Sequence, residues 1–306
     1  MKTAIDLFAG LGGNSEGARM AGLTVTWAAN HWRSAVETHA ANHPEAIHVC
    51  QDLHQADWTA VPAHDLLMAS PACTGHTPAR GKERPHHDAA RATAWAVVDA
   101  VECHRPPVFM VENVPAFATK WVLYQSWCAA LNALGYALSP VIWDAADCGI
   151  PQHRKRILIV GTRSKHPIEL AAPSMAHRPV RDVIDFNAGT WSPVQHPKRV
   201  AKTLARVSAG RRQFGDRFVM PYYGSGSGLT GRSLDRPLGT VTTRARWAVV
   251  DGDRMRMLTK AENVAIMGFP VNYNVPENDT LALHMLGNAN PPQLAAHAIE
   301  AIRKAA

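Results

Sequence analysis

Short apolar runs alternate with helix-like segments through the first half of the chain, and this alternation constrains the fold more than any other feature. The apolar runs are expected to form strands at residues 3–8, 24–29, 46–50, 65–69, 108–111, 139–143 and 156–160. Segments with helical spacing lie between several of them, at residues 15–21, 33–41, 89–103 and 123–134. Strands that alternate with helices form a parallel sheet with helices on its faces. The sequence therefore predicts an α/β fold with a doubly wound, mainly parallel sheet.

The alternation fades after Gly161, and residues 164–250 are rich in Pro, Gly, Arg and aromatic side chains. We expect a smaller, irregular domain there, with a mobile loop at residues 224–228. A helical pattern returns from Leu258, and residues 292–304 have the spacing of an amphipathic helix. The predicted division is a first domain at 1–163, a second at 164–255, and a hinge and C-terminal segment at 256–306 that returns to the first domain.

Positive charge is concentrated in the second region. Between Thr190 and Val250 the sequence has 11 Lys or Arg and 2 Asp or Glu, whereas the whole chain carries a net charge of +7. The rest of the chain is therefore slightly negative. A basic segment of this kind is typical of a surface that meets a polyanion, but also of a solvated basic face. Composition alone leaves both interpretations open.

Several classes of protein are disfavoured. No apolar run approaches the roughly 20 residues that a membrane span needs. Asp6 and the glycines after it interrupt any signal-peptide core. We therefore expect a cytoplasmic protein that makes no membrane contact. The five cysteines are scattered and never spaced as C-x-x-C, which disfavours a disulfide framework or a structural zinc site. We predict no metal, and free thiols of which one is reactive.

A glycine-rich segment at residues 6–13 follows the first predicted strand and opens a helix. Its glycines allow a tight turn and a close approach of the backbone to a ligand, and the helix N-terminus offers N–H donors. A strand–turn–helix of this kind suits a nucleotide-like cofactor. The pattern differs from G-x-G-x-x-G, which disfavours NAD.

Polar side chains also follow the next predicted strands. These are Asn30, Asp52, Cys73, and the pair Glu112 and Asn113. Ligands bind outside the carboxyl ends of strands in an open α/β sheet, so we expect these groups to converge. A cysteine in a Pro- and Gly-rich loop at that edge is a candidate nucleophile.

The pairing of Cys73 with Glu112 suggests one reaction in particular. A thiolate that adds to carbon 6 of cytosine, with an acid at N3, makes carbon 5 nucleophilic enough to attack an electrophilic methyl group. The base must leave the helix for this chemistry, which costs a few kcal/mol of unstacking. Arg154 and Arg156 lie on one side of an extended segment and suit the cytosine O2 and a phosphate, or an ordinary basic strand edge.

Read together, these segments resemble the DNA cytosine-5 methyltransferase family, whose motifs they match in order over nearly the whole chain. The matches are the cofactor loop at 6–13, Pro71-Ala72-Cys73, Val111-Glu112-Asn113-Val114, the Gln-x-Arg-x-Arg motif at 152–156, the segment 256–270, and Gly287-Asn288-Ala289-Asn290-Pro291-Pro292. The resemblance implies a Rossmann-like S-adenosylmethionine-dependent fold. The region 1–163 would then be the catalytic domain and 164–255 the target-recognition domain.

The resemblance also implies roles. Cys73 is the expected nucleophile, Glu112 the partner of N3, Arg156 a contact to the flipped cytosine, and Arg154 a support for the loop or a phosphate. The S-adenosylmethionine pocket, with S-adenosylhomocysteine as product, is expected to be lined by Phe8, Gly10, Leu11, Gly12, Asn30, His31, Asp52, Leu53, Pro71 and Asn288. In this pocket Asp52 is expected to meet the adenine amino group, and Asn288 to close the pocket. Residues 75–87 are expected to form a catalytic loop, in which Arg80, Lys82 and Arg84 meet phosphates.

Three departures from the family pattern stand out. Asn30 occupies the place of a glutamate that holds the ribose hydroxyls, and a neutral amide holds a hydroxyl less strongly than a carboxylate. Ala72 and Thr74 replace the usual Pro and Gln around the nucleophile. Asn290 replaces a valine in the closing motif. None of these changes removes the thiol or the acid.

Double-stranded DNA is the expected substrate, bound by a monomer in a bacterial or phage-infected cell, and a cognate restriction endonuclease is a candidate partner. Two alternatives stay open. One is a cytosine-5 methyltransferase that acts on RNA, such as a tRNA; the other is a DNA-binding homologue that has lost catalysis. Asn30 also raises the question of a modified sulfonium donor.

Overall fold

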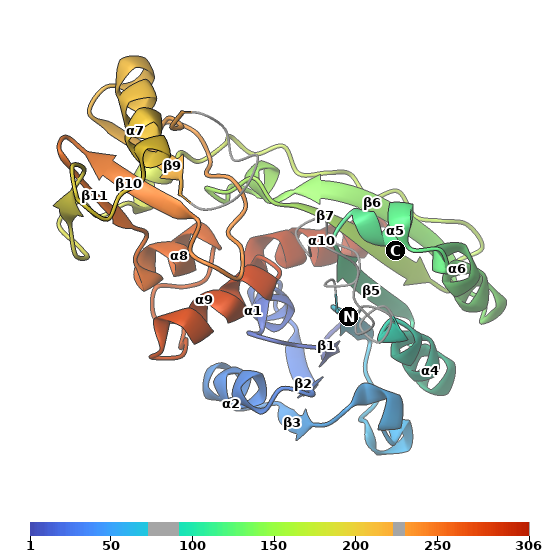
Figure 1. Cartoon of the computed structure of the whole chain (residues 1–306). Coiled ribbons are helices and arrows are strands. Elements are labelled where there is room, and N and C mark those ends of the chain that lie inside the picture. The colour runs from blue at the N-terminus through green and yellow to red at the C-terminus, as the bar shows by residue number, and fades with distance from the viewer. Residues whose placement is uncertain (73–91, 223–229, 306) are drawn as a thin grey trace. The chain divides into compact units, whose positions relative to one another are not determined.

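The computed structural model describes residues 1–72, 92–222 and 230–305. The chain divides into two compact units, coloured by residue number in Figure 1. The first unit comprises Met1–Asp144, Lys155–Ser174 and Ala289–Ala306, and the second comprises Ala145–Arg154 and Met175–Asn288. The boundaries of these units differ from those of the functional regions expected at 1–163, 164–255 and 256–306. The division into those functional regions remains a prediction.

A seven-stranded sheet forms the centre of the first unit, in the order β3-β2-β1-β4-β5-β7-β6. Its strands are β1 (Thr3–Leu7), β2 (Thr24–Asn30), β3 (Ile47–Cys50), β4 (Leu66–Ala69), β5 (Val108–Asn113), β6 (Ala137–Asp144) and β7 (Lys155–Thr162). The strands β1 to β5 pair in parallel, whereas β7 runs antiparallel to both β5 and β6. The predicted mainly parallel sheet is confirmed.

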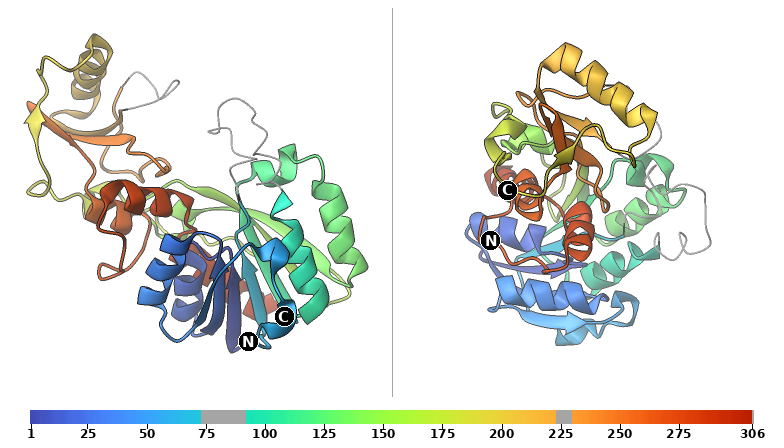
Figure 2. Two further views of the ribbon diagram at one scale, coloured as in Figure 1. Left: turned by 60° about the horizontal axis from the view of Figure 1, so that its bottom comes forward. Right: turned by 60° about the vertical axis from the view of Figure 1, so that its left-hand side comes forward.

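Helices flank this sheet on both of its faces, as the left view of Figure 2 shows. They are α1 (Gly13–Met20), α2 (Arg33–Asn42), α4 (Trp95–His104), α5 (Ala116–Lys120), α6 (Tyr124–Ala133) and α10 (Pro292–Ala305). Gly22 and Gly135 directly follow the C-caps of α1 and α6, Ala21 and Leu134, and have positive φ angles of 74° and 89°, which suit glycine. The chain's last helix, α10, is amphipathic as predicted and buries Leu294, Ile299 and Ile302.

The strands of the first unit are apolar because helices cover the sheet. All six residues of β5 are buried, including the polar pair at its end, Glu112 and Asn113. The aromatic side chains of Phe109, Phe117 and Trp127 are completely buried in the same core. The sheet therefore holds the ends of its central strands in fixed register, and it is at those ends that the polar residues lie.

The second unit contains a four-stranded antiparallel sheet in the order β8-β11-β10-β9. Its elements are β8 (Ser192–Pro193), α7 (Ala201–Phe214), β9 (Arg217–Pro221), β10 (Trp247–Asp251), β11 (Arg254–Met257), α8 (Lys260–Ile266) and α9 (Asp279–Asn288). Phe218, Met220 and Val250 form its core with residues of α7 and β11. This region is thus more regular than the sequence suggested. The sequence pattern did not reveal the sheet, because the strands are short and are separated by long Pro- and Gly-containing connections. The predicted loop at 224–228 lies outside the described residues.

Within the described ranges, no helix is both long and apolar enough to cross a lipid bilayer.

Candidate active site

The glycine-rich loop connects β1 to α1 through three residues with positive φ: Phe8 (59°), Gly10 (54°) and Gly12 (95°). A left-handed conformation is uncommon for a bulky residue such as Phe8 and often marks a functional turn. The loop is held by hydrogen bonds from Ala9 N to Ala29 O (3.0 Å) and from Gly12 N to Ala9 O (2.8 Å). It brings the predicted cofactor residues Phe8, Gly10, Leu11 and Gly12 to the end of β1. The N-terminus of α1 follows directly and provides N–H groups for an anionic or polar ligand.

The start of α1 packs closely against the returning C-terminal segment. A Cβ atom on Gly13 would lie 1.8 Å from the carbonyl oxygen of Asn290, so only glycine fits there. Asn290 Nδ2 donates to Asn14 Oδ1 (2.9 Å), and Asn14 Nδ2 donates to Ser70 Oγ (3.0 Å). The asparagine that departs from the family pattern thus has a buried polar partner on α1. Sequence reasoning did not find this role, because only the fold brings residues 14 and 290 together.

The predicted ribose and adenine contacts lie at the ends of β2 and β3. Asn30 is buried at the last position of β2, and its Oδ1 accepts a hydrogen bond from Trp32 N (2.9 Å). His31 is exposed beside it. Asp52 is exposed and caps a short 3-10 turn by accepting from His54 N (3.0 Å), while Leu53 is buried. The hydrogen bond from Gln51 N to Asn30 O (3.1 Å) joins the two strand ends, as the sequence led us to expect.

Backbone and side-chain groups of other elements hold residues 70–72, the segment before the predicted nucleophile. Ser70 N donates to Leu7 O (3.1 Å), Asn113 Nδ2 donates to the carbonyl of Pro71 (3.0 Å), and Ala72 N donates to Thr93 Oγ1 (3.1 Å). The backbone of residues 70–72 is therefore fixed from three sides beside the end of β1. Cys73 itself and the predicted catalytic loop at 75–87, with Arg80, Lys82 and Arg84, lie outside the described residues.

The predicted acid and its arginine form a buried ion pair. Arg156 Nε lies 2.7 Å from Glu112 Oε1, and the side chains are only 10% and 6% exposed. The register of β5 against β7, in which Glu112 faces Leu158 and Asn113 faces Ile157, places the two residues on adjacent strands. Arg156 also donates from Nη1 to the carbonyl of Lys155 (2.8 Å). An ion pair of this kind fixes the carboxylate in position.

Arg154, two residues before Arg156, belongs to the second unit. Its side chain is 1% exposed and donates to the carbonyls of Val241 (2.9 Å) and Gly287 (2.7 Å). The neighbouring Gln152 is fully buried and accepts from Val241 N (2.7 Å). Of the two roles expected for Arg154, support of a loop and contact with a phosphate, this geometry favours the first.

The basic residues of the second unit are largely engaged within it. Arg211 and Arg217 pair with Asp253 and Asp251 at 2.7 Å each. Arg232 lies over the ring of Trp247 at 5.0 Å. These contacts neutralise part of the charge that the sequence placed between 190 and 250. Sequence counting missed this, because it does not show which arginines are already paired.

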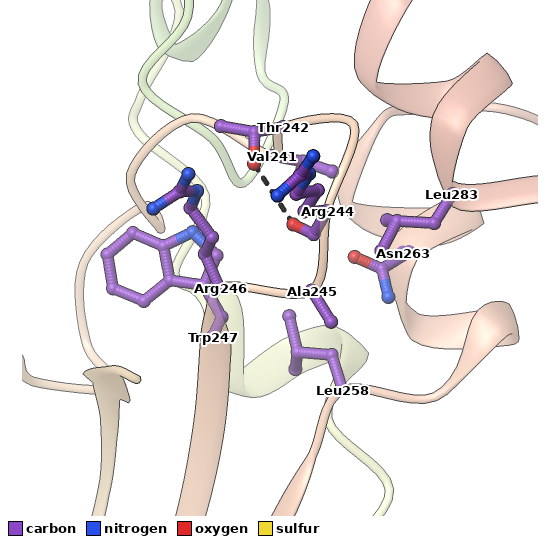
Figure 3. A pocket seen from close by; sticks show the side chains of 9 residues that line it. All are labelled: Val241, Thr242, Arg244, Ala245, Arg246, Trp247, Leu258, Asn263 and Leu283. Carbon is purple, nitrogen blue, oxygen red and sulfur yellow. Dashed lines mark hydrogen bonds between the residues drawn. The ribbon is translucent and has the colours of Figure 1, made fainter. Parts of the chain in front are cut away.

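A shallow hollow lies in the second unit beside the segment that Arg154 supports. Figure 3 shows its lining: Val241, Thr242, Arg244, Ala245, Arg246, Trp247, Leu258, Asn263 and Leu283. The exposed Arg244 and the half-buried Arg246 rise from one turn, which the Thr242 hydroxyl stabilises by donating to the carbonyl of Arg244 (3.0 Å). The hollow is thus lined by two guanidinium groups and by apolar side chains, including Leu258 and Leu283.

Asn288, the predicted closing residue of the cofactor pocket, is the last residue of α9 and is exposed in the second unit. Its contact with the cofactor therefore stays a prediction. No cluster of His, Cys, Asp or Glu that could hold a metal ion occurs among residues 1–72, 92–222 and 230–305.

The residues present fit a cofactor that carries both hydroxyl groups and positive charge. Gly10 and Gly12 leave room along the loop, and the exposed carboxylate of Asp52 lies at the neighbouring strand end. Asp6, on β1 just before the loop, is completely buried, and no Lys or Arg of the described residues forms an ion pair with it. A buried carboxyl without a basic partner favours a positively charged ligand at the adjacent loop.

The sheet order and the loop at the end of β1 define a Rossmann-like methyltransferase fold. Residues 2–304 match the family of C-5 cytosine-specific DNA methylases, and the chain belongs to this family.

Known proteins resemble the chain over almost its full length. Type II methyltransferase M.HgiDI of Herpetosiphon aurantiacus is 29% identical over 96% of this chain and 92% of its own. Type II methyltransferase M.NlaX of Neisseria lactamica is 25% identical over 93% and 91%. Among solved structures, a mutant of Spodoptera frugiperda DNMT2 covers 99% of this chain and 100% of its own, with a TM-score of 0.72 at 15% identity. The latter likeness supports the fold alone.

Proposed function

We propose that the chain is an S-adenosylmethionine-dependent DNA methyltransferase that acts on carbon 5 of cytosine. The observation that carries the proposal is the buried Glu112–Arg156 pair at the end of β5, bonded through Asn113 to the segment that leads into Cys73. Addition of a thiolate to a pyrimidine requires an acid at N3, and Glu112 lies next to Asn113, which bonds to Pro71, two residues before Cys73 in the sequence. Membership of the family over residues 2–304 supports the same reaction.

We assign the roles of the residues from the motifs that carry them, and the contact between Glu112 and Arg156 supports the assignment. Cys73, as the thiolate, adds to carbon 6 of a flipped cytosine. Arg156 holds Glu112 Oε1, so we assign Oε2 to the proton at N3 of the base. Carbon 5 becomes nucleophilic and takes the methyl group that the bound cofactor supplies. Water then takes the proton from carbon 5, and cleavage of the bond between carbon 6 and sulfur expels Cys73 as the thiolate, which restores the aromatic ring.

Residues of the first unit would hold the cofactor. The loop residues Phe8, Gly10, Leu11 and Gly12 lie along its expected path, and Asp52 suits its adenine amino group. Asn30 suits a ribose hydroxyl, although its own Oδ1 is occupied by Trp32 N, which leaves the Nδ2 amide as the donor. This arrangement predicts weaker ribose binding than a carboxylate would give.

Duplex DNA is the proposed substrate, because the relatives named above are Type II methyltransferases and because the second unit is rich in arginine. Arg244 and Arg246 are the guanidinium groups of that unit best placed for phosphates or base edges. We also propose that the protein acts in restriction–modification with a cognate endonuclease.

The test is expression in a host that lacks cytosine methylation, followed by bisulfite sequencing of its DNA. The proposal predicts full conversion to 5-methylcytosine within one short sequence motif. Unmodified DNA, or 5-methylcytosine in transfer RNA only, would refute it. Purified protein with tritiated S-adenosylmethionine and plasmid DNA provides the same test in vitro.

A further inference from the structure

A continuous chain of buried polar groups runs from the cofactor loop to the surface of the first unit. Ser15 Oγ donates to Asp6 Oδ2 (2.7 Å) and lies 2.9 Å from His39 Nε2. His39 Nδ1 lies 2.8 Å from His48 Nε2. Asp6, Ser15 and His39 are at most 1% exposed, whereas His48 is only half-buried. This row of hydrogen-bonded side chains connects β1, α1, α2 and β3 and reaches solvent at His48.

The three hydrogen bonds that link Asp6, Ser15, His39 and His48 can all form in two proton arrangements. When Asp6 is ionised, Ser15 donates to it, His39 Nε2–H donates to Ser15, and His48 Nε2–H donates to His39 Nδ1. When Asp6 is protonated, it donates to Ser15, Ser15 donates to His39 Nε2, and His39 Nδ1–H donates to His48. The two arrangements interconvert by one hop along each hydrogen bond. His48 exchanges the outer proton with water, so the ionised arrangement holds one proton fewer and one negative charge more, located on Asp6.

Asp6 lacks a basic side chain that would neutralise it. Within the described ranges, no Lys or Arg makes an ion pair with this carboxyl. Burial raises the pKa of Asp6 to about 7, opposed by the Ser15 hydrogen bond, and Glu112 adds a smaller effect in the raising direction. A cation that arrives at the neighbouring loop would therefore favour the ionised form.

Other titratable groups face the chain as well. Burial and the neighbouring His43 and His48 lower the pKa of His39 well below its usual value, so His39 is neutral. Burial also lowers the pKa of His48, opposed by its hydrogen bond to the Ala46 carbonyl and by Glu45. Neutral imidazoles both donate and accept, which is what a relay of protons requires.

We propose that Asp6 releases a proton when the methyl donor binds, and that Ser15, His39 and His48 pass this proton to solvent. The proposal rests on the proposed function, since S-adenosylmethionine is the ligand. Its sulfonium gives it a net positive charge, whereas S-adenosylhomocysteine is neutral overall. By linkage, a cation that favours ionised Asp6 must release protons on binding wherever Asp6 is partly protonated.

The experiment is stopped-flow mixing of the protein with S-adenosylmethionine in weakly buffered solution at pH 6.5, with a pH-indicator dye. Calorimetry in two buffers of different ionisation enthalpy measures the affinity and gives an independent count of the released protons. We expect release approaching one proton per donor bound at pH 6.5, and almost none at pH 8.5. S-adenosylhomocysteine should bind with less than half of this release.

Variants separate the carboxyl from the relay. Asp6→Asn should bind the donor with no proton release. His39→Gln should retain the proton count but release at least ten-fold more slowly, because an amide interrupts the relay. His64→Gln, in a histidine pair outside the chain, is the matched control and should behave as wild type.

Three outcomes would overturn the proposal. Binding without proton release at pH 6.5 refutes the coupling while leaving the proposed function intact. Unchanged release in Asp6→Asn, or a wild-type rate in His39→Gln, refutes the assignment to this chain. Absence of donor binding in the folded protein refutes the proposed function and the coupling with it.

Discussion

Replacement of Glu112 by Gln separates the chemical role of this residue from its structural one. The amide keeps the shape of the side chain and an oxygen that can accept from Arg156 Nε, but it removes the charge. Removal of one partner from a buried ion pair costs about 3–5 kcal/mol. Because Gln retains the hydrogen bond in neutral form, the expected loss of unfolding free energy is only about 1–2 kcal/mol.

This cost is small beside the roughly 5–15 kcal/mol that stabilises a typical domain, so the variant should fold. Loss of the acid at N3 should instead slow methyl transfer by about 10²–10⁴-fold. The assay is single-turnover transfer from tritiated S-adenosylmethionine to plasmid DNA, at concentrations that saturate the protein with both. Urea unfolding of the same preparations measures the change in stability.

Glu262→Gln provides the matched control. Glu262 pairs with Arg256 at 2.6 Å, with both side chains at most 3% exposed, and it lies in the second unit at the start of α8. This variant should lose as much stability or more, because Glu262 also caps α8, but should transfer methyl groups at the wild-type rate once folded. Turnover of Glu112→Gln within three-fold of wild type, or equal loss in both variants, would refute the reasoning.

Three further predictions follow from the same contacts. Arg154→Met should lower the unfolding free energy by about 3–5 kcal/mol, because it leaves the carbonyls of Val241 and Gly287 without their buried donor; a loss below 1 kcal/mol by urea unfolding would contradict this. The pKa of Asp6 is raised from 3.8 to about 7 in the folded protein, so the stability that protonated Asp6 contributes is present at low pH and is lost as pH rises through this range. The unfolding free energy of wild type should therefore fall by about 3 kcal/mol relative to that of Asp6→Asn between pH 5 and pH 8. A difference between the two unfolding free energies that stays constant with pH would argue against this prediction. DNA affinity should fall steeply with salt through the arginines of the second unit, and a flat response in fluorescence anisotropy would exclude that unit from the interface.

Much of the fold could be predicted from the sequence, because strand and helix periods are local signals. The apolar runs marked all seven strands of the first unit, and polar residues after them marked the edge where ligands bind. The antiparallel direction of β7 was not evident, since periodicity gives no strand direction. The small sheet of the second unit was missed because β8 has only two residues, and because the paired strands β9 and β10 are separated in the sequence by a long Gly- and Pro-containing segment.

The candidate site was predictable to the extent that its chemistry is carried by local motifs. Glu112 and Arg156 were both predicted as site residues from the sequence. Their buried contact was not predicted, because it depends on the register of β5 against β7. The partnership of Asn14 with Asn290 joins residues 276 positions apart, and the polar chain behind Asp6 joins four separate elements. Pairings of this kind arise from tertiary packing and leave no signal within any single segment.

Trapping of a covalent complex tests the central claim most directly. In DNA that contains 5-fluorocytosine, the fluorine at carbon 5 blocks the elimination step, so the enzyme should stay bonded to its target base. The account predicts a denaturant-resistant complex that needs S-adenosylmethionine, with the base mapped by mass spectrometry to the sulfur of Cys73 and absent in Cys73→Ser. No complex with a DNA-bound, folded protein, or attachment at another cysteine, would contradict it.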